Sequence, residues 1–245
     1  MRFGSLTPVK SIFIVILALL FSKADAATIT WADPNNGGVW TTGTNWVGGV
    51  APSPNDDVVI NPASNIVITG TPTIILGSLT VNGTADVTLQ GAAAVTVTIS
   101  ANAAANDLDV QAGSLTAGTN VTLTMAAGSN ANVATGATLA LNGGTFSTAA
   151  TAGTTVLVDG SFNAGGTLTL GAGSVMTIDG TFNNPSNSVT FTSTAATLQF
   201  TSGSTYNHQR NGGVVPTATW NVNSTCNITG LTSTSATGLS GQTFG

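Results

Sequence analysis

The chain has few charged residues, and basic residues are the scarcest. Its 245 residues include four Lys or Arg and nine acids, all of them Asp. Arg2, Lys10 and Lys23 lie close to the N-terminus, so Arg210 is the only base in the remainder of the chain. Nucleic acids and anionic membrane surfaces are bound through clusters of Lys and Arg. The composition therefore argues against nucleic acid as a partner and against electrostatic docking to a membrane.

Cysteine and histidine are equally scarce. Cys226 and His208 are the single examples of each. One Cys cannot form an internal disulfide, and one Cys with one His cannot supply the four ligands of a transition-metal site. Asp56-Asp57 and Asp107-Leu108-Asp109 offer oxygen atoms for calcium, but their spacing matches no EF-hand or nonapeptide calcium repeat. We therefore predict no cofactor and no catalytic residue, with calcium as the alternative.

The N-terminal segment 1–26 has the three parts of a secretory signal. Arg2 and Lys10 flank an apolar run from Ile12 to Phe21, and Ala24-Asp25-Ala26 supplies the small residues of a cleavage site. The apolar run is too short to cross a bilayer. We expect cleavage after Ala26 and a secreted, extracellular or cell-surface protein whose mature chain, with a net charge of about −7, does not insert into membranes.

The rest of the chain has the composition of strands and turns. Thr, Val, Asn and Gly dominate, and apolar residues alternate with Thr over segments such as 95–99, 121–125 and 167–170. Alternation with period two predicts short β-strands. Asn-Gly and Asp-Gly steps between them are expected to supply left-handed backbone angles at corners.

Internal repeats indicate how these strands are arranged. Val158-Asp159-Gly160-Ser161-Phe162 recurs as Ile178-Asp179-Gly180-Thr181-Phe182, and we include the related motifs 141–146 and 81–84 in the same repeat. The motif 77–80 returns as 113–116, at close to twice that interval. A repeat of about 20 residues with two or three strands matches one turn of a solenoid, in which Phe162 stacks on Phe182. We predict an all-β parallel β-solenoid (β-helix), with an antiparallel β-sandwich as the alternative because Asn-Gly also marks hairpins.

The chain divides into four parts that differ in composition and in the pattern of apolar residues. These are the signal peptide at 1–26, a Trp-rich N-terminal cap at 27–60, the solenoid rungs at 61–202, and a less regular C-terminal solenoid segment at 203–245 that reads as truncated. Tryptophan near the end of a solenoid usually closes the open core. If exposed, such rings stack on sugars, which makes Trp40 and Trp46 the candidate ligand contacts.

The Trp-rich block also carries a family resemblance. The segments 38–46 and 55–60, with Trp40, Trp46 and Asp57, resemble the opening of bacterial secreted β-solenoid surface proteins, including autotransporter passengers and cell-surface proteins of the Bacteroidetes. The stretch 203–220 is similar to the second group. The resemblance implies a surface role, with extracellular glycans or other surface proteins as partners.

Asp159 and Asp179 form the best candidate pair of carboxylates. If they lie one rung apart on a corner, they are close enough to act together. β-Helical polysaccharide hydrolases need paired carboxylates, and the lyases need a basic residue as well, for which Arg210 is the one candidate. Corner formation by Asp-Gly is the competing interpretation. We predict a non-catalytic extracellular or cell-surface structural or adhesin-type protein. The alternatives are a carbohydrate-binding module and then a β-helical polysaccharide lyase or hydrolase.

Two further patterns have competing interpretations. Thr-x-Thr pairs begin at residues 28, 96, 122, 167 and 190, and a flat ladder of such pairs orders water as an ice-binding surface requires. Their spacing is uneven, so the sequence does not predict a single array, and outward Thr on strands is the ordinary explanation. His208, with Tyr206 and Arg210 nearby, is expected to lie in a surface loop rather than in a polar site.

Overall fold

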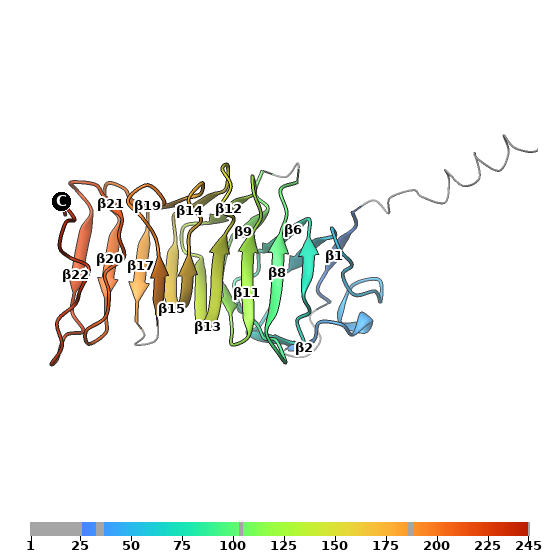
Figure 1. Cartoon of the computed structure of the whole chain (residues 1–245). Coiled ribbons are helices and arrows are strands. Elements are labelled where there is room, and N and C mark those ends of the chain that lie inside the picture. Colours follow the sequence, from blue (N-terminus) through green and yellow to red (C-terminus); the bar gives the residue numbers. More distant parts are fainter. Residues whose placement is uncertain (1–25, 33–36, 103–104, 186–188, 245) are drawn as a thin grey trace, which may run out of the picture.

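The computed structural model describes residues 26–32, 37–102, 105–185 and 189–244. Over these residues the chain is all-β, with short parallel strands stacked into an elongated solenoid (Figure 1). The only described helix is the single 3-10 turn η1 (Gly43–Asn45), and no described helix is long and apolar enough to cross a membrane. The predicted signal peptide, apart from Ala26, lies outside the described residues.

The first face of the solenoid is one sheet of nine described strands. Every pairing in this sheet is parallel, and each strand contributes inward apolar residues to a common core. In stacking order the strands are β1 (Thr28–Thr30), β3 (Asp57–Ile60), β6 (Ser78–Val81), β9 (Leu108–Val110), β12 (Asn130–Val133), β14 (Thr155–Val158), β16 (Val175–Ile178), β19 (Leu198–Phe200) and β21 (Thr219–Trp220).

The second face is also built from parallel strands. Two of them, β13 and β15, are long because they continue round a corner into the third face, and a register shift between Asn142 and Thr145 marks that corner. In stacking order the strands are β2 (Gly37–Val39), β4 (Ile66–Thr69), β7 (Asp86–Leu89), β10 (Ser114–Ala117), β13 (Thr138–Thr148), β15 (Ser161–Thr169), β17 (Thr181–Asn184), β20 (Thr205–His208) and β22 (Thr225–Ile228).

The third face lies beside the second, beyond that corner. Its strands pair in parallel and in unbroken order from the first to the last. They are β5 (Ile74–Leu76), β8 (Val95–Ile99), β11 (Val121–Met125), the second half of β13, the second half of β15 and β18 (Thr190–Thr192). The prediction of a parallel solenoid is therefore confirmed, and the antiparallel sandwich is not observed among the described residues.

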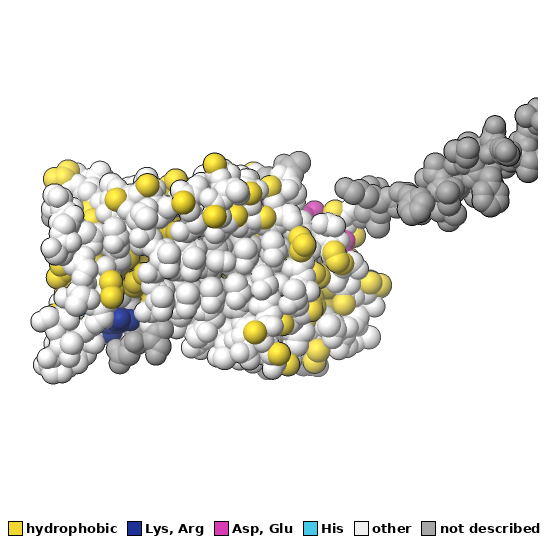
Figure 2. Space-filling model, in the orientation of Figure 1, with side chains coloured by type: hydrophobic (Ala, Val, Ile, Leu, Met, Phe, Trp, Pro, Cys, Tyr) yellow, Lys and Arg dark blue, Asp and Glu magenta, His cyan; other side chains and the backbone are white. Residues whose placement is uncertain are grey.

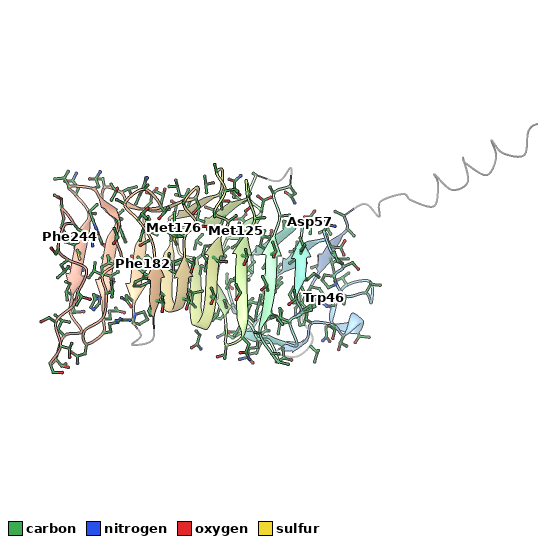
Figure 3. All side chains as sticks on the ribbon, viewed as in Figure 1. Trp46, Asp57, Met125, Met176, Phe182 and Phe244 are labelled. Atoms are coloured by element: carbon green, nitrogen blue, oxygen red, sulfur yellow. The ribbon has the colours of Figure 1, made fainter. Side chains whose placement is uncertain are left out.

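Aromatic side chains stack along the interior as predicted. Phe162 pairs with Phe182 in register, and their ring centroids lie 5.1 Å apart. Further along, Phe200 and Trp220 stack face to face at 4.1 Å. Stacked and edge-on aromatic pairs stabilise a core beyond the area that they bury. The column continues to Phe244, which lies at the opposite end of the solenoid from Trp46 (Figure 3).

Two of the predicted repeat alignments are wrong. Phe146 pairs with Leu168 on the third face and not with Phe162 on the second, so the motif 141–146 is not equivalent to the Asp-Gly motifs. Leu79 lies on the first face and Leu115 on the second, so the motifs 77–80 and 113–116 are not two turns apart. The cause is variable loop length, because the number of residues in one turn differs along the first face.

The role predicted for glycine at the Asp-Gly corners is also wrong. Gly160 and Gly180 do not have positive φ angles, whereas Gly143 does, at +75°. Instead, a Cβ at Gly180 would collide with the carbonyl oxygen atoms of Gly160 and Asp159 in the preceding turn. These corners need glycine because the backbones of neighbouring turns approach too closely for a side chain.

Candidate functional site

The outward surface of the third face carries two columns of hydroxyl side chains. Five adjacent strands each place a Thr-x-Thr or Thr-x-Ser pair on it, and every pair is in register with the next. We call this set the threonine face: Thr96 and Thr98, Thr122 and Thr124, Thr145 and Ser147, Thr167 and Thr169, and Thr190 and Thr192.

This arrangement corrects the expectation that the uneven spacing of the Thr pairs prevents a single array. The long interval between Thr122 and Thr167 covers two turns, and Thr145 with Ser147 supplies the pair between them. The pair that begins at Thr28 does not belong to the array, because it lies on β1 of the first face. The remaining differences in spacing are absorbed by loops of different length between the faces.

Thr190 and Thr192 of the threonine face are exposed, and its other eight residues are half-buried. Thr124 Oγ1 and Ser147 Oγ lie 2.9 Å apart and share a hydrogen bond. The other eight hydroxyls form no hydrogen bond with another described residue. Because each hydroxyl both donates and accepts, these groups are left to organise water.

A tightly packed layer supports the threonine face from inside. The residues between the outward Thr side chains point into the core, and Val97, Leu123, Phe146 and Leu168 have no exposed surface. Close-packed interiors hold their side chains in single rotamers and resist deformation. The outward hydroxyls therefore stand on a stiff base.

The ten residues of the threonine face include no charged side chain. The described carboxylates lie on the first face, on the second face or at corners, and Arg210 follows β20 of the second face. Figure 2 shows uncharged polar side chains and backbone over the middle of the solenoid, where β8 and β11 run in Figure 1. The surface is thus regular in its strand pairing, polar and uncharged.

A second outward column, on the second face, is built from asparagine. Asn163, Asn183, Asn207 and Asn227 lie in register on β15, β17, β20 and β22, and we call them the asparagine ladder. Each amide donates to the oxygen of the one before it, at 2.7 Å, 2.9 Å and 3.1 Å in turn. The ladder thus uses its own hydrogen-bonding groups to join neighbouring turns.

Trp40 and Trp46, the candidate ligand contacts, are buried. Their exposed fractions are 1% and 2%, and their ring centroids lie 5.0 Å apart. Trp46 Nε1 donates to the Trp40 carbonyl oxygen at 2.7 Å, and Trp31 packs edge-on against Trp46. Both rings are enclosed by the N-terminal end of the core, so neither presents a free face on which a sugar can stack.

Asp159 and Asp179 occupy equivalent corners of successive turns. The backbone N–H of Asp159 donates to Val133, and that of Asp179 donates to Val158. The Asp179 carboxylate accepts a hydrogen bond from the Thr201 hydroxyl. Arg210 follows the far end of β20, so the length of a second-face strand separates it from this corner. The structure therefore brings the two carboxylates to neighbouring turns but does not bring the base to them.

The carboxylates considered for calcium are engaged with protein donors. Asp107 accepts from the backbone N–H groups of Asn102 and Asn130, and Asp57 accepts from the Ser78 hydroxyl and the Asn102 amide. Asp109 accepts from the amides of Gln111 and Asn132. Among the described residues, no three His, Cys, Asp or Glu side chains gather into a metal-binding group.

The segment around His208 differs from the expected surface loop. Tyr206 and His208 lie on β20, point inward and have no exposed surface. His208 Nε2 lies 2.7 Å from the Gly212 carbonyl oxygen, to which it donates. Its Nδ1 lies 3.0 Å from the Tyr206 hydroxyl, within hydrogen-bond distance.

Asn184 completes this buried polar cluster, although no sequence motif singled it out. Its Nδ2 donates to the Tyr206 hydroxyl at 2.9 Å, and its Oδ1 has no partner among the described residues. Burial raises the pKa of the Tyr206 phenol far above its usual value. The alternation Tyr206-x-His208 and Phe182-x-Asn184 was the available signal, because period two places both members of each pair on one side of a strand.

Comparisons with known proteins do not identify this chain. No model of a protein family matches it, and searches among curated proteins and among solved structures find no match. Of the resemblance drawn from the Trp-rich block, the structure supports the β-solenoid architecture.

Proposed function

We propose that the protein is a non-catalytic extracellular or cell-surface protein whose solenoid presents a rigid adhesive surface. The observation that carries this proposal is the threonine face, where ten hydroxyl side chains stand in register across five strands. Such a surface offers a repeated pattern to another surface rather than a cleft that encloses a small substrate. The signal pattern in segment 1–26 supports export.

The use of the titratable groups also supports a non-catalytic role. Asp107 holds two backbone N–H groups, Asp179 holds a corner hydroxyl, and His208 is locked between a carbonyl and a phenol in the core. A general acid or base has to reach the substrate and exchange protons with it. These groups are instead committed to the fold.

The carbohydrate-binding alternative depended on an exposed row of aromatic rings. Trp40 and Trp46 are enclosed by the core, so the structure offers no specific observation in its favour. The lyase or hydrolase alternative depended on Asp159 and Asp179 with a nearby base, and Arg210 lies beyond the other end of the strand. We therefore retain the structural and adhesive role as the proposal.

The proposal is tested by incubating the full chain with a panel of extracellular polysaccharides. Both binding and the release of new chain ends are measured. We expect no turnover by the wild-type chain or by a variant that carries Asp159→Asn and Asp179→Asn. Turnover by the wild-type chain that disappears in this double variant would contradict the proposal and make the corner an active site.

A further inference from the structure

We propose that the threonine face binds ice. This inference names the partner of the adhesive surface and rests on the proposed non-catalytic role. It follows from four properties of the threonine face: the geometry of its two columns, the stiffness of its side chains, the free state of its hydroxyls and its lack of charge. On the second face the outward hydroxyls of Ser161, Thr181, Thr205 and Thr225 also stand in register, but the column beside them is the self-bonded asparagine ladder.

The geometry of the threonine face is that of a regular two-dimensional lattice. Neighbouring strands of a sheet lie about 4.8 Å apart, and side chains two residues apart on a strand are separated by about 6.7 Å. The pairing across the five strands contains no register shift within the face, so both distances repeat along its length. The columns extend for about 19 Å. The face therefore presents oxygen atoms at two repeating distances, as a plane of a crystal lattice does.

The side chains that form this grid are stiff. Threonine branches at Cβ, which restricts χ1, the one rotatable bond that positions its hydroxyl oxygen. Leu123 and Phe146, directly between outward Thr residues, have no exposed surface and fix the backbone beneath them. A surface that is already ordered loses little conformational entropy on binding, which favours attachment to a rigid crystal.

The hydroxyls are free to hold water in lattice positions. Eight of the ten form no hydrogen bond within the described part of the chain. Ordered water bound to such groups costs little additional entropy and extends the protein surface outward. The threonine methyl groups lie beside the hydroxyls and limit the arrangements that this water can take.

The absence of charge distinguishes ice from other partners. Ionised side chains hold strongly oriented hydration shells that do not match a crystal lattice, and the threonine face carries none among its described residues. The threonine face also presents no aromatic ring on which the apolar face of a sugar could stack. Ice is therefore the partner that its chemistry favours.

Ice growth in a solution of the full chain tests the inference. Two quantities are measured. The first is thermal hysteresis, the gap between the melting and freezing temperatures of a single ice crystal, and the second is the recrystallisation (coarsening) of polycrystalline ice. The main variant combines Thr122→Tyr with Thr145→Tyr, two adjacent positions in one column that then project above the plane. Thr177→Tyr is the matched control, because Thr177 is an outward, half-buried Thr on β16 of the first face.

We expect the wild-type chain and Thr177→Tyr to produce thermal hysteresis and to inhibit recrystallisation. We expect both activities of the double Tyr variant to be lower by about tenfold or more. Circular dichroism establishes that each variant is folded. If the double Tyr variant is unfolded, Thr122→Lys replaces it, since a solvated charge on the plane has the same expected effect.

Three results would overturn the inference. The first is a folded wild-type chain that produces neither thermal hysteresis nor inhibition of recrystallisation. The second is a folded double Tyr variant that keeps full activity. The third is a chain that binds crystalline cellulose or chitin but not ice. The polysaccharide turnover assay is independent of this outcome. If the chain neither binds ice nor cleaves polysaccharide, the proposed non-catalytic role still holds. If it cleaves polysaccharide in a way that depends on Asp159 and Asp179, that role is wrong.

Discussion

The threonine face and the asparagine ladder have the same architecture and opposite chemistry. Both are columns of outward polar side chains held in register by parallel strands. Asparagine amides are long enough to bond from one turn to the next, and those of the ladder do so at 2.7 Å to 3.1 Å. Threonine side chains are too short to bridge the spacing of about 4.8 Å between turns unless the two hydroxyls point toward each other, as those of Thr124 and Ser147 do. A self-bonded column stabilises the fold, whereas an unbonded column is available to a partner.

The largest effect is expected from removing the ring beneath the threonine face. Phe146→Ala deletes a fully buried side chain between Thr145 and Ser147, and such changes lower the free energy of unfolding by about 3 to 5 kcal/mol. Phe200→Ala is the matched control, because its buried ring packs on Phe182 and Tyr206 beneath the asparagine ladder, and it is expected to lower stability by a similar amount. Urea unfolding measures both.

The two variants are expected to differ in ice activity. At a temperature where both are folded, Phe146→Ala loosens the base of the threonine face and weakens inhibition of ice growth, whereas Phe200→Ala leaves it near the wild-type level. Equal loss of ice activity in both variants would contradict the distinction between the two surfaces.

A smaller effect is expected within the ladder itself. Asn183→Ala removes the bond to Asn163 and the bond from Asn207, and we expect a loss of about 1 to 3 kcal/mol in the free energy of unfolding. Asn227→Ala removes only the bond to Asn207 and should cost about half as much. Ice activity should not change in either variant. An unchanged stability of Asn183→Ala would show that the ladder does not join the turns.

Tyr206, beneath the ladder, makes stability depend on alkaline pH. Burial raises its pKa in the folded protein, so above about pH 10 the unfolded chain loses this proton while the folded chain keeps it. Stability therefore falls as pH rises past that point, by at most about 1.4 kcal/mol per pH unit. Tyr206 is the only Tyr, and Tyr206→Phe removes this part of the slope. Burial also raises the pKa of the Cys226 thiol, but this thiol is present in both the wild-type chain and Tyr206→Phe. The difference between their two pH slopes therefore gives the contribution of the Tyr206 phenol. Identical slopes would contradict the assignment.

The smallest effect is expected from completing the threonine array. Ser147→Thr adds one methyl group to the only serine position of the threonine face, and outward substitutions of this kind change stability by about 0.5 kcal/mol or less. We expect inhibition of ice growth equal to or above the wild-type level. A marked loss would show that the Thr124–Ser147 contact, rather than the regular columns, governs the surface.

Local patterns in the sequence were sufficient to predict the fold class. Period-two alternation depends on residues within one strand, and the Asp-Gly motifs at 159 and 179 and the stacking of Phe162 on Phe182 depend on residues in two successive turns. The alignment of distant turns was not predictable in the same way, because loops of different length separate the faces. For this reason the motifs 77–80 and 113–116 were aligned although they lie on different faces.

The threonine face was missed for the same reason, and also because of its chemistry. A search for Thr-x-Thr does not find Thr145 with Ser147, and without that pair the interval between Thr122 and Thr167 looks irregular. A search for two hydroxyl residues around one apolar residue, with a spacing that is allowed to vary from turn to turn, finds all five pairs. The buried cluster of Asn184, Tyr206 and His208 was missed because polar residues are normally placed outside, although the alternation in β17 and β20 places these inside.

The most direct test of the central claim is the partition of the protein into a growing hemisphere of single-crystal ice. The fluorescently labelled full chain, the Thr122→Tyr and Thr145→Tyr double variant and the Thr177→Tyr control are each frozen slowly from dilute solution. The account predicts that the wild-type chain and the control are taken up on defined planes of the crystal, while the double variant is rejected into the liquid. Rejection of the wild-type chain, or equal uptake of all three proteins, would contradict it.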